Sequence, residues 1–552
     1  MPTFSLYQKK SFLLMDLGAS IIAESVRKIS DELVYLDLNA YLNMNENLKF
    51  EEEDFLNFSN FSEAEKIIFQ NTNKNVINLL KGFIKRIEEE GNLNEYDFIA
   101  YSVSQNPNSF FFYDITPFIF TLIFNHYIQR KLNHVIPSYI GGSGVKEVDL
   151  ILRSFPNYFN TEKNMIFPNE IFLHSVENAF PIYLLQNFNK HKENNKFKTP
   201  LSYLRKVISP EVAIPNNHED LSLNIQDKIT KDILLEFPEL SKLKNNKMTT
   251  YNFSKNCMFN CSFCDNHSDD FIYYKDFDIL INNFRKLRDH GIRNILFTDT
   301  NVNFNLKWLR ELCERLIKED LGIKWSISAN LSIYDEFTFK LLKAAGCVKL
   351  WFGAETISSR ILKINNKNLN KEKIIKGLQL SSEANIWNNC NFIVNFPTET
   401  AAEFSELKEF IKEYYTSDLI DGFVVNYFLL KTNNDYFDNS EKYGIEIIDK
   451  DINKNTYQWD DFTGRTPEEI NNEGLKRKEE IYKYLKINNF RLFESTEHLF
   501  FSLHDLYNGD KEKIKKVYNY INDNGLSERF FFFDNLKISE KTKKVHIKPL
   551  QI

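Results

Sequence analysis

The feature that most constrains the fold is a regular alternation of short apolar segments and amphipathic segments between residues 246 and 430. Between the apolar segments lie stretches long enough for one helix, several of them ending at a glycine such as Gly291 or Gly346. The segments with the composition of β-strands are 249–254, 294–300, 324–330, 349–355, 391–397 and 422–430. Strand–helix units are joined by right-handed crossovers, so we predict a parallel sheet that forms a partial (β/α)6 barrel. Functional groups are then expected at the carboxyl ends of its strands.

Further regions flank this barrel, as the length of 552 residues requires. The N-terminal region alternates apolar segments, such as 97–104 and 134–142, with helix-like segments, which predicts a Rossmann-like α/β domain with a helical insertion. A polar, proline-containing linker follows it, and a charged, aromatic, mainly helical region follows the barrel, which we interpret as a cap or a substrate-binding region. The expected domains are 1–208 (Rossmann-like), 209–245 (linker), 246–430 (barrel) and 431–552 (C-terminal region).

The composition restricts the function classes. A hydrophobic content of 43% and a charged content of 26% are typical of a globular protein. The net charge of −7 argues against a partner such as nucleic acid. We expect no membrane association and no export signal, since Asp16 interrupts the apolar stretch near the start and the most apolar segment, 110–124, is shorter than the ~20 residues that span a bilayer. We therefore expect a cytoplasmic, reducing location, where clustered thiols indicate metal binding.

Three of the six cysteines of the chain, Cys257, Cys261 and Cys264, lie within eight positions in a C-x3-C-x2-C pattern, and none precedes them. Three thiolates on one short loop can bind three corners of a 4Fe–4S cluster and leave the fourth iron open. Zinc is an alternative, because His267 would complete a Cys3His site, and inert thiols are a third. The position after the first barrel strand favours the cluster, because the carboxyl end of a barrel strand is a catalytic position.

This pattern after the first strand of a partial barrel resembles the radical S-adenosylmethionine (radical SAM) enzymes. The resemblance implies that the methionyl amine and carboxylate of S-adenosylmethionine (SAM) chelate the open iron, and that reductive cleavage of the sulfonium gives a 5′-deoxyadenosyl radical. It also implies that Phe263, just before the last cysteine, lies near the adenine.

The resemblance continues through 246–430. Residues 294–305 resemble the second-strand segment of the family, which ends in an acidic residue, here Asp299. Residues 344–367 resemble its fourth-strand G-x-E-s segment, with Gly353, Glu355, Arg360 and Lys367 in register, and 391–400 resemble its fifth-strand segment. Further SAM contacts are therefore expected from Asp299, Ser328 and Glu355.

These carboxylates can accept hydrogen bonds from a ribose or an ammonium group. The alternatives are structural: Asp299 could cap the next helix, and Glu355 could pair with Arg360.

The sequence departs from the family pattern at three asparagines. Asn256 and Asn395 stand where relatives have glycine, and we interpret both as left-handed turns, which asparagine tolerates. Asn330 stands where relatives usually carry arginine at the end of the third strand, which removes a cation that could bind the SAM carboxylate.

The N-terminal region resembles the cobalamin-binding Rossmann-like domain that precedes the barrel in one large radical SAM subgroup. Gly141 and Gly142 end a predicted strand there, where close backbone approach would let the nucleotide tail of a cofactor lie against the sheet. A simple turn is the alternative. No D-x-H-x-x-G motif surrounds any histidine. Some members of the subgroup bind cobalamin without that motif, and others have a vestigial domain.

The leading hypothesis is a radical SAM enzyme with a 4Fe–4S cluster, SAM and, if the N-terminal domain retains its binding role, cobalamin. Its most specific form is a cobalamin-dependent C-methyltransferase acting on a natural product or a peptide. The alternatives are a cyclase or rearrangement enzyme with a vestigial cobalamin domain and, from another class, a zinc-stabilised binding protein. An electron donor such as flavodoxin or ferredoxin is the expected partner. Cys313, Cys347 and Cys390 are interpreted as structural thiols, so no second cluster is expected.

Overall fold

The chain divides into two compact units, 1–222 with 533–552, and 223–532. The computed structural model describes residues 3–4, 14–15, 23, 27, 33–34, 36, 74–103, 116–133, 135–141, 170–171, 214, 222–223, 229–244, 246–255, 257, 259–264, 273–274, 276–302, 305–331, 335–431, 434–451, 456–487 and 497–526.

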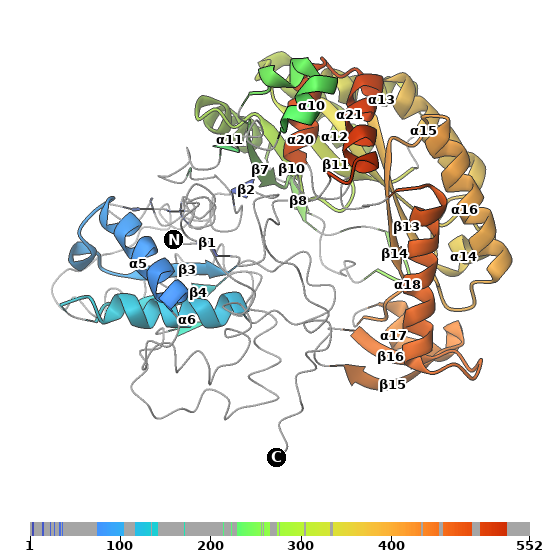
Figure 1. Cartoon of the computed structure of the whole chain (residues 1–552), viewed down its shortest axis with the longest axis horizontal. Helices are drawn as coiled ribbons and strands as arrows, with labels where there is room; N and C mark the ends of the chain where they lie inside the picture. The colour runs from blue at the N-terminus through green and yellow to red at the C-terminus, as the bar shows by residue number, and fades with distance from the viewer. Residues whose placement is uncertain are drawn as a thin grey trace. The chain divides into compact units, whose positions relative to one another are not determined.

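The N-terminal unit contains a parallel sheet whose strands lie side by side in the order β1 (Thr3–Phe4), β3 (Ile99–Val103), β4 (Ser138–Gly141) and β5 (Glu170–Ile171). Two helices pack against each other and against this sheet (Figure 1). Phe124 of α6 (Thr116–Gln129) contacts Phe83 of α5 (Lys74–Glu88) at a ring distance of 5.6 Å and Tyr101 of β3 at 6.1 Å. The other described elements of this unit are β2 (Leu14–Met15) and η3 (Leu93–Glu95). The predicted Rossmann-like α/β sheet is confirmed.

The second unit contains the predicted partial barrel. Its six strands lie side by side in chain order, and every neighbouring pair is parallel. They are β7 (Asn246–Tyr251), β10 (Asn294–Phe297), β11 (Lys324–Ala329), β12 (Cys347–Glu355), β13 (Trp387–Val394) and β14 (Gly422–Tyr427). The short strand β6 (Ser222–Leu223) precedes them, and β8 (Ser254–Lys255) pairs antiparallel with β9 (Tyr273–Tyr274).

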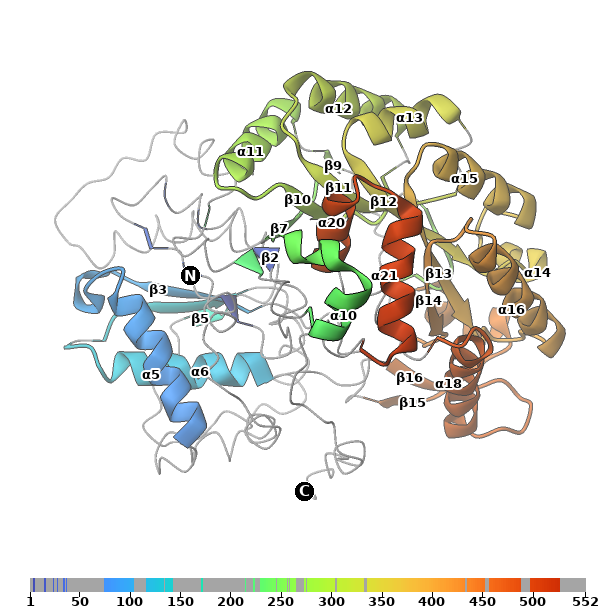
Figure 2. The same cartoon turned by 45° about the horizontal axis from the view of Figure 1, so that its top comes forward.

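The connecting helices cover the outer, convex face of this sheet (Figure 1 and Figure 2). They are α11 (Phe277–Asp289), α12 (Leu306–Glu319), α13 (Glu336–Ala344), α14 (Ser359–Ile364), α15 (Lys371–Glu383) and α16 (Ala401–Thr416). Each begins after an Asp, Asn, Ser or Thr whose side chain accepts a backbone N–H of the first turn. Gly291 and Gly346 follow α11 and α13 with φ of +77° and +94°, as the sequence predicted.

Alternate residues of each strand face the helices or the concave side. On β13, the Asn388 amide donates to the carbonyl of Leu378 on α15 at 2.8 Å, so Asn388 faces the helices. Its register partner on β12 is Leu350, which therefore faces them too. The residues between them point to the concave side, because side chains alternate along a strand. On β12 and β13 these are Lys349, Trp351, Gly353, Trp387, Asn389 and Asn391, before the register shift that precedes Glu355.

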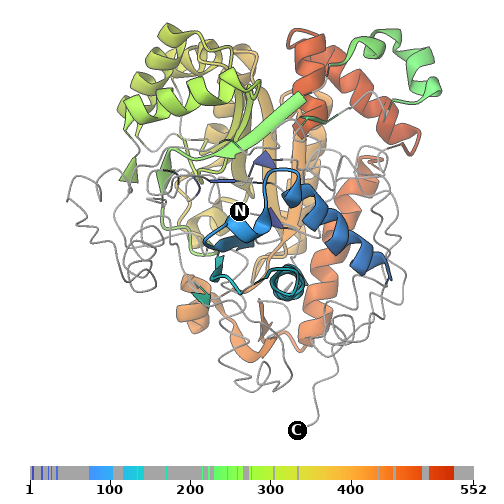
Figure 3. The same cartoon turned by 90° about the vertical axis from the view of Figure 1, so that its left-hand side faces the viewer.

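Residues 431–532 belong to the same compact unit as the barrel. The C-terminal helices α20 (Glu497–Leu506) and α21 (Lys511–Asp523) pack beside α10 (Lys231–Glu236), which precedes the barrel (Figure 3). The rings of Phe237 and Tyr520 lie 5.5 Å apart there. The 3-10 helix η7 (Pro238–Lys242) follows α10. The other described elements of the C-terminal region are α17 (Asp435–Asp438), η8 (Ser440–Tyr443), β15 (Glu446–Asp451), β16 (Thr456–Asp460) and α18 (Pro467–Tyr484).

Helix α20 closes the amino ends of the barrel strands. The amide of Asn246, the first residue of β7, donates to the carbonyl of His498 at 3.3 Å. The rings of Trp387, the first residue of β13, and Phe500 lie 5.3 Å apart. The C-terminal region thus closes the end of the barrel opposite the cysteines, which follow the carboxyl end of β7. Among the described residues, no helix is both long and apolar enough to cross a bilayer.

Candidate functional site

The cysteine loop, which we define as residues 257–264, is held by the turn that follows α14. The Ser262 backbone N–H donates to the carbonyl of Asn365 at 3.1 Å, and the Ser262 hydroxyl donates to the carbonyl of Ile364 at 3.3 Å. The Asn366 amide donates to the carbonyl of Asn260 at 2.9 Å. The backbone of the loop is thereby fixed against the fourth strand–helix unit of the barrel.

A second anchor comes from the start of α17. The Asn434 amide donates to the carbonyl of Phe263 at 3.2 Å, and the N–H of Tyr436 donates to the carbonyl of Ser262 at 3.4 Å. The Phe263 ring packs at 5.7 Å from Phe396, beside a buried aromatic cluster that includes Tyr436. The structure therefore gives Phe263 a packing role, and its expected contact with adenine stays a prediction.

Asp299 fixes the backbone that leads into the cysteine loop. Its buried carboxylate accepts the backbone N–H of Ser254 at 2.7 Å and that of Phe253 at 3.2 Å, and it also accepts the Ser254 hydroxyl. These residues directly precede the loop. The alternative role as a helix cap is wrong, because Asn305 caps α12. A contact between Asp299 and SAM stays a prediction.

The three thiols of the loop are half-buried. Burial raises the pKa of the Cys261 thiol, the Lys367 ammonium lowers it, and Glu355 and Cys257 raise it, so these groups lie near one another. Within the described part of the chain, no three His, Cys, Asp or Glu side chains are arranged to hold a metal ion. The cluster ligands therefore stay a prediction based on their donor chemistry. His267 lies outside the described residues, so the structure does not test the alternative of a Cys3His zinc site.

Glu355 and Lys367 form a buried ion pair next to this loop. Their Oε1 and Nζ atoms lie 2.6 Å apart, and the two side chains are only 13% and 7% exposed. The Lys367 ammonium also lies 5.8 Å from the centre of the Phe263 ring. Gly353 makes room for the pair, since a Cβ atom there would stand 2.6 Å from Glu355 Oε1 and 3.1 Å from Lys367 Nζ.

The expected alternative, a pair between Glu355 and Arg360, is wrong. The Arg360 guanidinium binds the Glu403 carboxylate at 2.6 Å and the carbonyl of Thr398 at 2.7 Å. Arg360 lies in the first turn of α14 and points toward α16, where it pairs with Glu403. The partner of Glu355 is Lys367, which follows α14. Lys367 belongs to the fourth-strand motif of the sequence, but only the fold shows that its partner is Glu355.

The other positions singled out in the sequence have different outcomes. Ser328 is half-buried on β11, in register with Trp351 of β12. Asn395 has φ of +61°, which confirms the left-handed turn expected there, and its amide donates to the carbonyl of Ile470 at 2.9 Å. Asn256 lies outside the described residues. Cys313, Cys347 and Cys390 are buried, and burial raises the pKa of all three thiols, in agreement with structural roles.

Glu399 is a titratable group that the sequence analysis missed. Its carboxylate is 1% exposed, accepts the N–H of Asn395 at 2.6 Å and pairs with Arg477 of α18 at 2.7 Å. Burial raises its pKa to about 7, against the opposing effects of Asn395 and Arg477. The signal in the sequence was its place in the fifth-strand motif, but its partner comes from 78 residues further along the chain.

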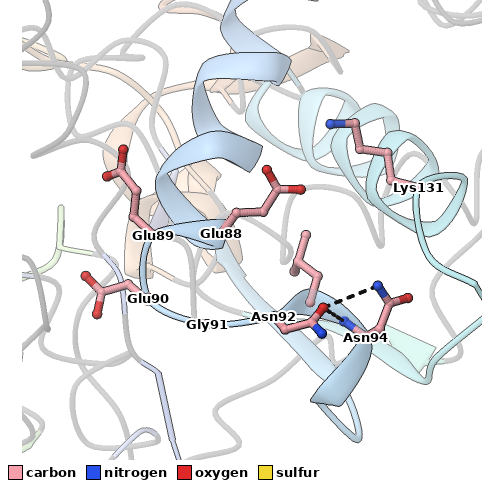
Figure 4. Close-up of a pocket in the computed structure, with 8 residues that line it drawn as sticks. Glu88, Glu89, Glu90, Gly91, Asn92, Asn94 and Lys131 are labelled. Carbon is pink, nitrogen blue, oxygen red and sulfur yellow. Dashed lines mark hydrogen bonds between the residues drawn. The ribbon is translucent and has the colours of Figure 1, made fainter.

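In the N-terminal unit, Gly141 ends β4 as expected, and Gly142 lies outside the described residues. A cavity of about 470 Å³ lies at the opposite edge of the sheet, since it is lined by residues 88–94, which precede β3, and by Lys131, which precedes β4 (Figure 4). Ligands of parallel sheets bind at the carboxyl edge. We therefore assign no cofactor to this cavity.

Comparison with known proteins identifies the domain that contains this site. Residues 251–411 match the family model of the Radical SAM superfamily. This segment is therefore a radical SAM domain, and it contains the cysteine loop, Asp299, Glu355 and Lys367.

The curated relatives match about a third of this chain. An anaerobic magnesium-protoporphyrin IX monomethyl ester cyclase of Rubrivivax gelatinosus is 27% identical over 198 residues, which are 34% of this chain and 35% of the relative. An uncharacterized methyltransferase of Pyrococcus horikoshii is 28% identical over 163 residues, 29% of this chain and 36% of the relative. The chain spans about a third of the length of these curated relatives.

A solved structure matches almost the whole chain. It is the cobalamin-dependent S-adenosylmethionine radical enzyme OxsB with aqua-cobalamin and S-adenosylmethionine bound, at a TM-score of 0.51 and 14% identity, covering 96% of this chain and 79% of that chain. At this identity the likeness shows the fold: a Rossmann-like domain followed by a partial barrel.

Proposed function

We propose that the chain is a radical SAM enzyme, most specifically a cobalamin-dependent C-methyltransferase that acts on a small natural product or a peptide. The observation that carries this proposal is the cysteine loop of the radical SAM domain, anchored at the carboxyl end of the barrel beside the Glu355–Lys367 pair. The site combines soft thiol ligands with one buried anion and one buried cation.

The thiols of Cys257, Cys261 and Cys264 are the ligands that would hold a 4Fe–4S cluster. A cluster with one open iron supplies the electron that cleaves the sulfonium of SAM reductively and starts radical chemistry on an unreactive carbon. The chain itself fixes the loop through backbone hydrogen bonds, so that the thiols stay on one short, supported segment.

Glu355 and Lys367 are suited to the amino-acid end of SAM. An ammonium of a ligand would bind the Glu355 carboxylate, and a carboxylate of a ligand would bind the Lys367 ammonium. Lys367 thereby supplies the cation that the sequence lacks at Asn330. The two side chains also neutralise each other, at 2.6 Å.

The cobalamin-dependent form of the reaction is supported by the fold of the N-terminal unit, which corresponds to that of a cobalamin-dependent radical enzyme. A cyclase with a vestigial cobalamin domain is the second candidate, because the relatives include both a cyclase and a methyltransferase. Both reactions need a low-potential electron donor such as flavodoxin or ferredoxin.

The test is the metal content of protein purified anaerobically from cells supplied with cobalamin, together with the formation of 5′-deoxyadenosine from SAM after chemical reduction. About four irons per chain with SAM cleavage is the expected result. About one cobalt alongside them would support methyl transfer, and iron without cobalt would favour the second candidate. Stoichiometric zinc without iron would overturn the proposal.

A further inference from the structure

One row of side chains crosses the concave face of the barrel below the cysteine end. Ser328 of β11 is in register with Trp351 of β12, and Trp351 is in register with Asn389 of β13. Register partners in a parallel sheet share a face. Since Asn388 faces the helices, Asn389, and with it Trp351 and Ser328, faces the concave side. We call these three residues the polar row.

The polar row contains buried groups that have no partner. Asn389 is fully buried, and within the described residues neither its Nδ2 nor its Oδ1 has a hydrogen-bond partner. The buried indole Nε1 of Trp351 likewise lacks an acceptor among them. Buried polar groups in proteins are almost always satisfied, and leaving them unpaired lowers stability. A chain that keeps two such groups side by side is therefore expected to use them.

The neighbouring asparagine provides an internal comparison. Asn388 is also fully buried, but its Nδ2 donates to the carbonyls of Leu378 at 2.8 Å and Leu419 at 3.0 Å, and only its Oδ1 lacks a partner among the described residues. Two adjacent asparagines of one strand thus differ in role. One joins the sheet to the outer helices, and the other turns an unpaired amide toward the concave face.

Among the described residues, the charged side chains on β12 below and above the polar row are paired with opposite charges. Below it, the Lys349 ammonium lies 4.3 Å from the Trp351 ring and is neutralised by Glu497 of α20 at 2.5 Å. Above it, four residues further along β12 and about 13 Å away, Glu355 is neutralised by Lys367. A ligand carboxylate would find two donors but would also face the Asn389 carbonyl oxygen. A group that carries both a C=O and an N–H satisfies all three unpaired atoms.

We infer that the polar row is the substrate-binding subsite of the barrel and that it takes a neutral amide or lactam group. The substrate C=O accepts from Trp351 Nε1 and Asn389 Nδ2, and its N–H donates to Asn389 Oδ1. This inference rests on the proposed function for the presence of a substrate in the barrel. It restricts the substrate class to small molecules that carry a neutral, amide-like group.

The first part of the test uses the two adjacent asparagines. Asn389→Leu replaces an unpaired amide by an apolar side chain of similar size, so the melting temperature of the ligand-free full chain should rise by a few degrees. The matched control, Asn388→Leu, removes two hydrogen bonds and should lower it. A lower melting temperature for Asn389→Leu would show that this amide is satisfied within the fold, which would overturn the inference.

The second part measures binding of a defined probe. In the ¹⁵N-tryptophan-labelled full chain, the Trp351 indole signal is identified by its loss in Trp351→Phe. Benzamide should shift this signal in the wild type and in Asn388→Leu, but at least tenfold more weakly in Asn389→Leu. Benzoate of the same size should bind at least tenfold more weakly than benzamide. Equal shifts by both probes, or no shift by benzamide, would refute the amide subsite.

A third probe separates the substrate from the cofactor. 5′-Methylthioadenosine carries the nucleoside of SAM without its amino-acid end. If it shifts the Trp351 signal as strongly as benzamide does, the polar row belongs to the cofactor and the inference fails. Iron content and SAM cleavage of the wild type are measured separately. Benzamide binding without iron would refute the proposed function and leave the subsite standing.

Discussion

Strand β12 carries a Lys–Glu ion pair at each end of the barrel, and the two pairs differ in their surroundings. Lys349 and Glu497 lie 2.5 Å apart with side chains 4% and 2% exposed, and the Lys349 ammonium also lies 4.8 Å from the Phe500 ring. Lys367 and Glu355 lie at nearly the same distance, but beside the thiols and with more of the carboxylate exposed. The distance within the pair therefore does not separate their roles.

The surroundings do separate them. At the closed end, burial lowers the pKa of Lys349 and only Glu497 offsets it, so the pair holds α20 in one position against the sheet. At the cysteine end, the pair is held by a turn that also binds the cysteine loop. A ligand that carries both an ammonium and a carboxylate can pair with both side chains, its ammonium with Glu355 and its carboxylate with Lys367. We interpret the first pair as structural and the second as a ligand site.

The largest effect is expected at the cysteine end. Cys257→Ser, Cys261→Ser and Cys264→Ser should each abolish iron binding and SAM cleavage, because three thiolates are needed to hold a cluster with one open iron. Cys313→Ser, in the outer helix α12, is the control and should keep its iron. Iron and sulfide analysis checks both expectations. Full iron content in any of the three loop variants would remove that residue from the ligand set.

The closed end should show the largest loss of stability. Glu497→Gln leaves the buried Lys349 without its counter-charge, which is expected to cost about 3–5 kcal/mol of the free energy of unfolding. The double variant Lys349→Met/Glu497→Leu should recover most of this loss, because neither charge then remains buried. Urea unfolding of the single and double variants measures the difference. A loss below about 1 kcal/mol in Glu497→Gln would show that the pair is not structural.

A third buried pair, Glu399–Arg477, extends the comparison of the ion pairs. Its effect on stability is expected to depend on pH. The pKa of Glu399 is raised to about 7, so the folded state keeps a proton that the unfolded state releases above its ordinary value of 4.5. The contribution of this group to stability is therefore full below about pH 4.5 and is lost as the pH rises from there to about 7, by up to about 3 kcal/mol. Glu399→Gln should flatten this pH dependence of the free energy of unfolding. An unchanged slope in the variant would contradict the assignment.

The smallest effect concerns the ligand role of Lys367. Lys367→Met should weaken SAM binding about tenfold, which is about 1.4 kcal/mol, because it removes the cation opposite the SAM carboxylate. Binding of 5′-methylthioadenosine, which lacks that carboxylate, should not change, and Lys367→Arg should restore part of the SAM affinity. Equilibrium dialysis of the iron-loaded protein measures all of these affinities. Equal weakening for both ligands would instead indicate a general loss of structure.

The sequence predicted the architecture well because local patterns determine it. The strand order, the outer helices and the helix-ending glycines follow from apolar periodicity and from the backbone freedom of glycine. The least accurate strand boundary was that of β13, predicted from residue 391 and observed from Trp387. Asn388 and Asn389 hid its start, since asparagine is rare in strands. The error thus fell on the residues that carry a packing role and a proposed binding role.

The site was less predictable because its partners are distant in the sequence. Spacing suggested that Glu355 pairs with Arg360, five positions away, but the first turn of α14 directs Arg360 to Glu403. The partner of Lys349 comes from α20, 148 residues later. Such pairings depend on where whole elements pack, and no local pattern encodes them. The thiols could be predicted because one short loop carries all three.

The anchoring of the cysteine loop has a consequence for the biogenesis of the protein. The hydrogen bonds that shape this loop come from residues 102 and 171 positions further along the chain. Contacts of such long range form late in folding. A ribosome that has just released the three cysteines has therefore not yet made the residues that support them. Cluster insertion is accordingly expected after the barrel is complete, on a nearly finished chain.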